Sequence, residues 1–275
     1  MGLALGIVSL SWAAILIRFT SSPTVTVAAW RMALSAGVLL PLLAIRRPLL
    51  PRRGVGLAIA AGAFLALHFV LWFESLRHTT VASSVALVTT NPIFVGLFSV
   101  LLFRERPSRA LWQGILLSVA GGILISSGDF AVRGEALWGD GLALFGAVAA
   151  SAYLLVGRRA QRGGTLLPYV AVAYGVAALL LLGAAWGGGT PLPLTRDWLW
   201  IGLLALGPQL LGHTTVNWAL RRFPASAVAV AILGEPVGAT LWAWILLGEV
   251  PGVVQGVGIA FVLLGILRAL HEVEV

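Results

Sequence analysis

The sequence predicts an all-α membrane protein of ten transmembrane helices, arranged as two inverted five-helix repeats. Three observations support this fold class. Hydrophobic residues make up 59% of the chain and charged residues only 10%, along its whole length, which is not the composition of a soluble domain. Apolar segments of roughly 20 residues, long enough to cross a hydrocarbon core, recur along it. One long stretch is also written twice.

Breaks of proline, glycine and charge delimit ten apolar segments. The predicted spans are 3–19, 25–45, 55–76, 82–103, 109–127, 139–157, 165–186, 197–220, 226–247 and 251–270. The connections between them are short and leave no room for a soluble domain. We assign residues 1–130 to a first repeat of five spans and residues 139–270 to a second, which together form one domain.

The duplication is clearest between residues 81–107 and 225–251. These read VASSVALVTTNPIFVGLFSVLLFRERP and ASAVAVAILGEPVGATLWAWILLGEVP. Apolar bias alone would not align the prolines and glutamates that they share at an offset of 144 positions. The aligned pairs include Pro92 with Pro236, Glu105 with Glu249, and Pro107 with Pro251. Each copy holds an odd number of spans, so the second must enter the membrane the opposite way up.

Arginine positions set the expected orientation. With a cytoplasmic N-terminus, thirteen arginines near span ends lie inside and four lie outside, namely Arg18, Arg77, Arg133 and Arg196. Both termini are therefore expected in the cytoplasm, in a cell (inner or plasma) membrane. The first span is expected to be retained, because no basic segment precedes it and no small-residue cleavage site follows.

A polar residue stands directly before the central proline of each repeated stretch. It is Asn91 before Pro92 and Glu235 before Pro236, and each proline is expected to kink its helix. A carboxyl at this depth costs about 2.5 to 3.5 kcal/mol on insertion scales, which marks a functional site by default. The alternative is a packing kink with a buried, neutral acid.

Further polar and aromatic residues share helix faces with each other. His68 and Trp72 are four residues apart, and Gln209, His213 and Asn217 repeat that spacing in the eighth span, so each set faces one side of its helix. Together with aromatic residues at related positions they predict a small-molecule site. The expected substrate contacts are Trp12, His68, Trp72, Asn91, Tyr153, Gln209, His213, Asn217, Glu235 and Trp242.

Other interpretations of these residues stay open. The histidines are equally well explained as hydrogen-bonding residues between helices, and Arg31 is expected to snorkel to the external end of its span. No HxxxH spacing or carboxylate cluster supports a metal site, and the chain has no cysteine. No catalytic constellation, cofactor motif or long basic run is present, so neither an enzyme, a cofactor nor a nucleic-acid partner is expected.

The chain resembles the drug/metabolite transporter superfamily, specifically the EamA family of ten-helix exporters. The resemblance is carried by SWAAILIRF near the start, HFVLWFESLRHTTVASSVALVTTNPIFVGLFSVLLFRERP in the first repeat and GHTTVNWALRRFPASAVAVAILGEPVGATLWAWILLGEVP in the second. It implies export of amino acids, related metabolites or drugs through a central cavity lined mainly by helices such as the third, fourth, eighth and ninth.

These observations lead to three functional hypotheses. The first is a secondary transporter that works as a monomer in the bilayer and exports amino acids or related small metabolites by alternating access. Proton coupling is an open part of it, with Glu235 as the first candidate carrier and His68 or His213 as the second. The second hypothesis is efflux of drugs or cationic compounds. The third, of a different class, is a non-transporting scaffold or receptor.

Overall fold

The structure, a computed structural model, describes residues 2–46, 51–79, 84, 87–104, 107–126, 134–162, 165–248 and 250–270. Every regular element within these ranges is helical, which confirms the all-α prediction. The first residues of the fourth predicted span, at positions 82 and 83, lie outside the described residues, as do Glu105 and Glu249.

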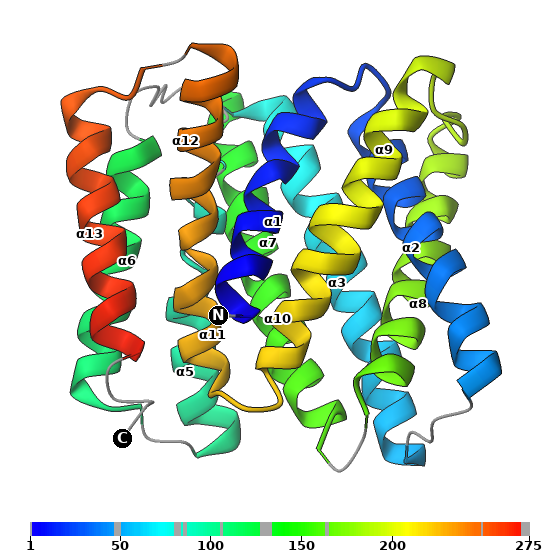
Figure 1. Cartoon of the computed structure of the whole chain (residues 1–275), viewed down its shortest axis with the longest axis horizontal. Coiled ribbons are helices and arrows are strands. Elements are labelled where there is room, and N and C mark those ends of the chain that lie inside the picture. The colour runs from blue at the N-terminus through cyan, green and yellow to red at the C-terminus, as the bar shows by residue number, and fades with distance from the viewer. Residues whose placement is uncertain are drawn as a thin grey trace. The chain divides into compact units, whose positions relative to one another are not determined.

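Seven of the ten predicted spans are uninterrupted helices (Figure 1). They are α1 (Gly2–Arg18), α2 (Thr24–Arg46), α3 (Arg52–His78), α6 (Arg109–Ser126), α7 (Gly134–Ala160), α8 (Leu166–Gly187) and α13 (Val253–Leu270). By length and composition, α2, α3, α7 and α8 qualify as membrane-crossing helices, as does the stretch Ala225–Leu246. Large apolar side chains such as Leu179 and Val253 are 73% and 86% exposed, as expected for a surface that faces lipid.

The chain forms two compact units that differ from the sequence repeats. Unit 1 comprises Met1–Val70 and Ala152–Arg222, and unit 2 comprises Leu71–Ser151 and Phe223–Val275. Each unit therefore draws helices from both halves of the duplicated sequence. The helices α3 and α7 each contribute one end to unit 1 and the other to unit 2.

In unit 1 the helix α2 packs along α8, and α1 packs against the middle of the eighth span. An apolar cluster of Ala13, Leu16, Val27, Ile201 and Leu204 joins the C-terminal end of α1 to the N-terminal ends of α2 and the eighth span. Because these side chains are 7% exposed or less, they form a core for this end of the unit.

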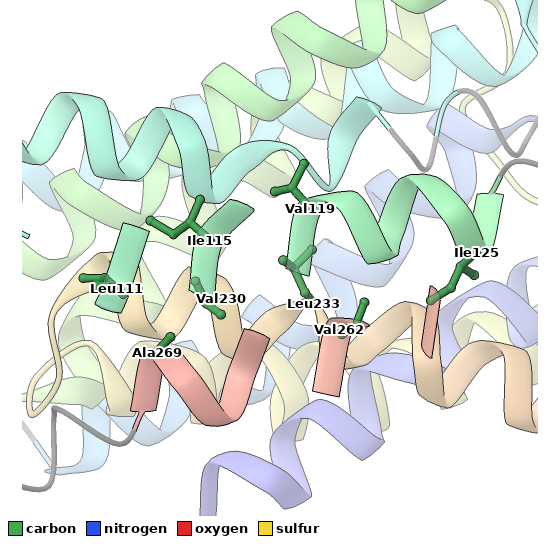
Figure 2. Packing of buried hydrophobic residues seen from close by; sticks show 8 residues of the cluster. All are labelled: Leu111, Ile115, Val119, Ile125, Val230, Leu233, Val262 and Ala269. Atoms are coloured by element: carbon green, nitrogen blue, oxygen red, sulfur yellow. The ribbon is translucent and has the colours of Figure 1, made fainter. Parts of the chain in front are cut away.

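In unit 2 the helices α6 and α13 run side by side (Figure 1). Figure 2 shows the apolar cluster at this contact, in which Leu111, Ile115, Val119 and Ile125 of α6 meet Val262 and Ala269 of α13, together with Val230 and Leu233 of the ninth span. Glycines bring the two backbones together. A Cβ atom added at Gly258 would lie 2.7 Å from the Gly121 carbonyl oxygen, and one added at Gly121 would lie 2.6 Å from that of Gly258. Small residues allow the same close approach in other membrane helix pairs.

The fourth and ninth spans break at matching positions. In the ninth, α11 (Ala225–Ile232) ends, Leu233 forms a turn, and α12 (Gly234–Leu247) begins. In the fourth, Thr89 and Thr90 form a turn before α5 (Asn91–Phe103). Pro92 and Pro236 consequently lie in the first turn of a half-helix, where the missing N–H costs no hydrogen bond.

The eighth span is a composite instead of the single helix predicted for 197–220. A 3₁₀ turn, η2 (Thr195–Asp197), leads into α9 (Trp198–Leu204), then into the π-helix η3 (Ala205–His213), and finally into α10 (Thr214–Ala219). Pro208 lies within the π-helix and has no N–H for an α-helical hydrogen bond. The wider turn changes the direction of the side chains that follow, and π-helical segments often mark functional sites.

Asp197 joins two loops at the end of unit 1 that carries Arg18. Its Oδ2 accepts hydrogen bonds from the Ser22 hydroxyl at 2.6 Å and from the amides of Ser21 and Ser22 at 3.0 and 2.7 Å. Burial of the carboxyl raises its pKa. The bonds from Ser22 and Ser21 and the charge of Arg196 outweigh that effect, so the pKa of Asp197 lies below its ordinary value.

The close packing of α6 and α13 predicts that Gly258→Ala destabilises unit 2. The added methyl group must push the α6 backbone away, and overpacking of this kind costs about 1 to 3 kcal/mol. We expect the thermal unfolding midpoint of the detergent-solubilised protein to fall by several degrees. Gly256→Ala, on an open face of the same helix, is the matched control and should leave the midpoint unchanged. Equal midpoints for the two variants would contradict the packing argument.

The Asp197 contacts predict a stability that depends on pH. A carboxyl with a lowered folded-state pKa stabilises the fold fully above its unfolded pKa of about 3.9 and loses that contribution as pH falls through the folded value. Asp197→Asn should therefore lower the unfolding midpoint by about 5 °C at pH 7, with the difference shrinking at pH 3. Asp140→Asn removes a carboxylate that accepts a bond from Thr79 and should have a smaller effect. A constant difference for Asp197→Asn across this pH range would refute the assignment.

Candidate functional site

The predicted substrate contacts divide between the two units. Unit 1 holds Trp12, His68, Tyr153, Gln209, His213 and Asn217, and unit 2 holds Trp72, Asn91, Glu235 and Trp242. In unit 1, hydrogen bonds and ring contacts join several of the six through shared neighbours.

Asn217 is the centre of a buried polar network in unit 1. Its Nδ2 donates to the Tyr153 hydroxyl at 2.6 Å, to the His213 carbonyl at 2.8 Å and, more weakly, to the Tyr174 hydroxyl at 3.3 Å. The Tyr174 hydroxyl also lies 3.3 Å from the Thr214 Oγ1. We call these residues the Asn217 network. They come from α7, α8, η3 and α10, so the network ties the composite eighth span to both neighbours.

The Asn217 network is buried and continues toward the C-terminal end of α7. Asn217, Tyr153 and Tyr174 are 3% exposed or less. Gln161, also buried, donates from Nε2 to the Asn217 carbonyl at 3.1 Å. The Asn217 Oδ1 has no hydrogen-bond partner within the described part of the chain. A buried, unpartnered acceptor is costly, which makes this atom available to a ligand or a water.

Arg31 corrects one of our expectations. It does not snorkel outward but is 2% exposed within α2. Its Nε and Nη2 both donate to the Gln209 Oε1, at 2.9 and 2.7 Å, and its guanidinium carbon lies 4.6 Å from the centre of the Phe69 ring. We call Arg31, Gln209 and Phe69 the Arg31 cluster. It places a permanent positive charge in the interior of unit 1.

Two histidines flank the same aromatic ring. The His68 and Phe69 ring centres are 5.2 Å apart, and those of Phe69 and His213 are 6.1 Å apart in an edge-on arrangement. Both histidines are half-buried. Across the described residues, no group of three or more His, Asp or Glu side chains is suited to hold a metal ion. Both histidine rings therefore contact the Arg31 cluster through the Phe69 ring.

Gln209 and Asn217 of the eighth span also bond to neighbouring helices. Gln209 bonds to Arg31 on α2, and Asn217 bonds to tyrosines on α7 and α8. The polar groups of this span therefore contribute to two neighbouring clusters.

Trp12 has apolar neighbours in the structure. Its ring packs against the cluster that includes Ala13, Leu16 and Val27. It is half-buried, so part of its surface is still accessible beside that core.

In unit 2 three of the predicted residues lie in the half-helices α5 and α12, and Trp72 lies on α3. Asn91 is the first residue of α5 and is 7% exposed. Its carbonyl accepts a hydrogen bond from the Ser151 hydroxyl at 3.0 Å. Glu235 is in the first turn of α12, with Trp242 two turns farther along. Glu235, Trp242 and Trp72 on α3 are all half-buried.

Several residues of the clusters were absent from the sequence-based set. Arg31 is the clearest, because an arginine inside an apolar span is itself a functional signal. Tyr174 and Gln161 gave weaker signals, since each is a single polar residue in an apolar helix. All three tyrosines of the chain, Tyr153, Tyr169 and Tyr174, are buried in unit 1.

Comparison with known proteins relates the chain to a family of transporters. The EamA-like transporter family matches residues 1–127 and again residues 137–270. The pseudopaline exporter CntI of Pseudomonas aeruginosa is 30% identical over 74% of this chain and 70% of its own. The uncharacterized transporter YwfM of Bacillus subtilis is 27% identical over 77% of this chain and 72% of its own.

A solved structure shows the same fold. A protein of known crystal structure superposes with a TM-score of 0.83, covering 99% of this chain and 97% of that one, at 20% identity. The fold of nearly the whole chain thus has a counterpart in a solved structure. The chain belongs to the EamA-like transporter family and is a multi-pass membrane transporter, not an enzyme.

Proposed function

We propose that this protein is a secondary transporter that exports amino acids or related small metabolites by alternating access. The proposal places it in the inner or plasma membrane with both termini in the cytoplasm, working as a monomer. Its two functional halves are the repeats 1–130 and 139–270. The relative from Pseudomonas aeruginosa exports pseudopaline, which supports export of a small organic molecule.

One observation carries the proposal: the interrupted spans and the polar candidates coincide. Gln209 and His213 lie in the π-helix, Asn91 begins α5, and Glu235 is in the first turn of α12. Discontinuous helices at mid-membrane are the usual places for substrate and coupling-ion sites in secondary transporters. A scaffold or receptor has no need for such costly interruptions.

The polar clusters suit a substrate with both polar and apolar parts. Amide, hydroxyl and guanidinium groups bind the polar ends, and aromatic rings such as Phe69 hold the apolar part. We propose the same ten substrate contacts as the sequence predicted, with Arg31 added. An amino acid or a related metabolite combines these properties.

Glu235 is the first candidate for proton coupling. The N-terminal turn of α12 favours a negative charge, whereas low-dielectric surroundings disfavour it. His68 and His213 are the second candidates. An uncoupled uniporter is the simpler alternative.

The test is efflux of a mixed amino-acid pool from proteoliposomes, with equal and unequal pH across the membrane. We expect the wild type to release a subset of the pool faster than empty liposomes. His213→Ala should reduce this efflux about tenfold or more, the effect of losing roughly 1.4 kcal/mol of binding. Glu235→Gln should abolish the response to the pH gradient while exchange at equal pH continues.

Glu74→Gln is the matched control. Glu74 is 43% exposed and pairs with Arg77 and His78, so its neutralisation should change neither efflux nor pH response. Wild-type release no faster than from empty liposomes would reject amino-acid export. Lipophilic cations would then test the drug-efflux hypothesis, and failure with both classes would favour a scaffold or receptor.

A further inference from the structure

The neutral oxygen of Gln209 occupies a face of Arg31 that suits a carboxylate. Nε and Nη2 present two parallel N–H donors, a geometry that carboxylates match with two oxygens. Here both donors converge on the single amide oxygen of Gln209, at 2.9 and 2.7 Å. A single neutral oxygen therefore accepts both hydrogen bonds, whereas a carboxylate would accept each with a separate, charged oxygen.

Gln209 is poorly satisfied in this arrangement. Its side chain is fully buried, and its Nε2 has no hydrogen-bond partner in the ranges the structure describes. Burying an amide N–H without a partner costs free energy. This cost at the Gln209 Nε2 offsets part of the stabilisation from the two bonds to Arg31.

The surroundings of Arg31 also favour an anion. The Phe69 ring supports the guanidinium from one side, which holds its plane in a fixed orientation. His68 and His213 lie beside the same ring, and imidazole N–H groups are hydrogen-bond donors. Ser35 fixes the same stretch of α2 through bonds to the Arg31 carbonyl and to Ala205 in η3.

We propose that Arg31 binds the carboxylate of the exported substrate, which takes the place of the Gln209 amide oxygen on the guanidinium. The inference rests on the proposed function and adds the chemical class of the substrate: a small molecule with a carboxylate near an apolar group. A charged, two-oxygen acceptor binds guanidinium more strongly than a neutral amide. Release of Gln209 also frees a residue of the π-helix, which links substrate binding to the interrupted span.

The experiment loads proteoliposomes with amino acids and, for each, its carboxamide, and measures release by mass spectrometry. For the wild type we expect release of the acids to exceed that of their amides by about tenfold or more. Arg31→Gln should abolish this preference. Arg31→Lys should retain part of it, because lysine keeps the charge but not the paired donors. Gln209→Glu should block acid release, since its own carboxylate would occupy Arg31.

Arg222→Gln is the matched control for loss of an arginine. Arg222 also lies over an aromatic ring, that of Trp218, at 4.2 Å, but it is exposed in the loop after α10. The control should keep the preference for acids. Thermal unfolding of each variant shows whether it is folded, and Gln209→Glu should unfold no earlier than the wild type.

The outcomes separate this inference from the proposed function. Equal release of acids and amides by the wild type, or an acid preference that survives in Arg31→Gln, would overturn the carboxylate site while leaving amino-acid export in place. No release of any pool member would reject amino-acid export itself. Leucine and leucinamide would then be compared as stabilisers of the purified protein. A midpoint raised by leucine alone, in wild type but not in Arg31→Gln, would support the site, and any other result would overturn it.

Discussion

The structure depends on one constraint: within a hydrocarbon core, each polar group needs a partner supplied by the protein. Breaks in helices are expensive under this constraint, yet three spans are interrupted within the residues that the structure describes. In unit 1 the interruption is stabilised by side chains from α2, α7 and α8, through the Arg31 cluster and the Asn217 network. The polar clusters thus have two roles: they stabilise the irregular eighth span, and they form the candidate site.

This dual role explains why hydrogen-bonding groups are left incompletely satisfied where the span is irregular. Gln209 and Asn217 each use one end of the amide and leave the other without a partner among the described residues. A rigid, fully satisfied network would hold the π-helix in a single arrangement. Incomplete satisfaction lowers the difference in free energy between arrangements, which a transporter needs in order to change conformation.

The sequence was informative where a physical pattern repeats. The apolar segments predicted the helices, and the duplicated stretch predicted irregular geometry near Pro92 and Pro236, although as kinks and not as the turns that precede α5 and α12. The π-helix was not predictable, because Pro208 alone gives no indication of whether a helix kinks, ends or widens. Arg31 was misplaced for a related reason: its distance from the span end suggested snorkelling, and only tertiary structure showed Gln209 within reach.

The composition of the two compact units has a consequence for biosynthesis. Unit 1 includes residues up to Arg222, and unit 2 includes the final helix. The first repeat is therefore synthesised before either unit is complete. The first five spans are thus synthesised before their native partners. Arg31 of α2, for example, lacks its contact with Gln209 until η3 has been made. Gene duplication produced two similar halves, but the units that pack are shared between them, so neither half is a self-sufficient folding unit.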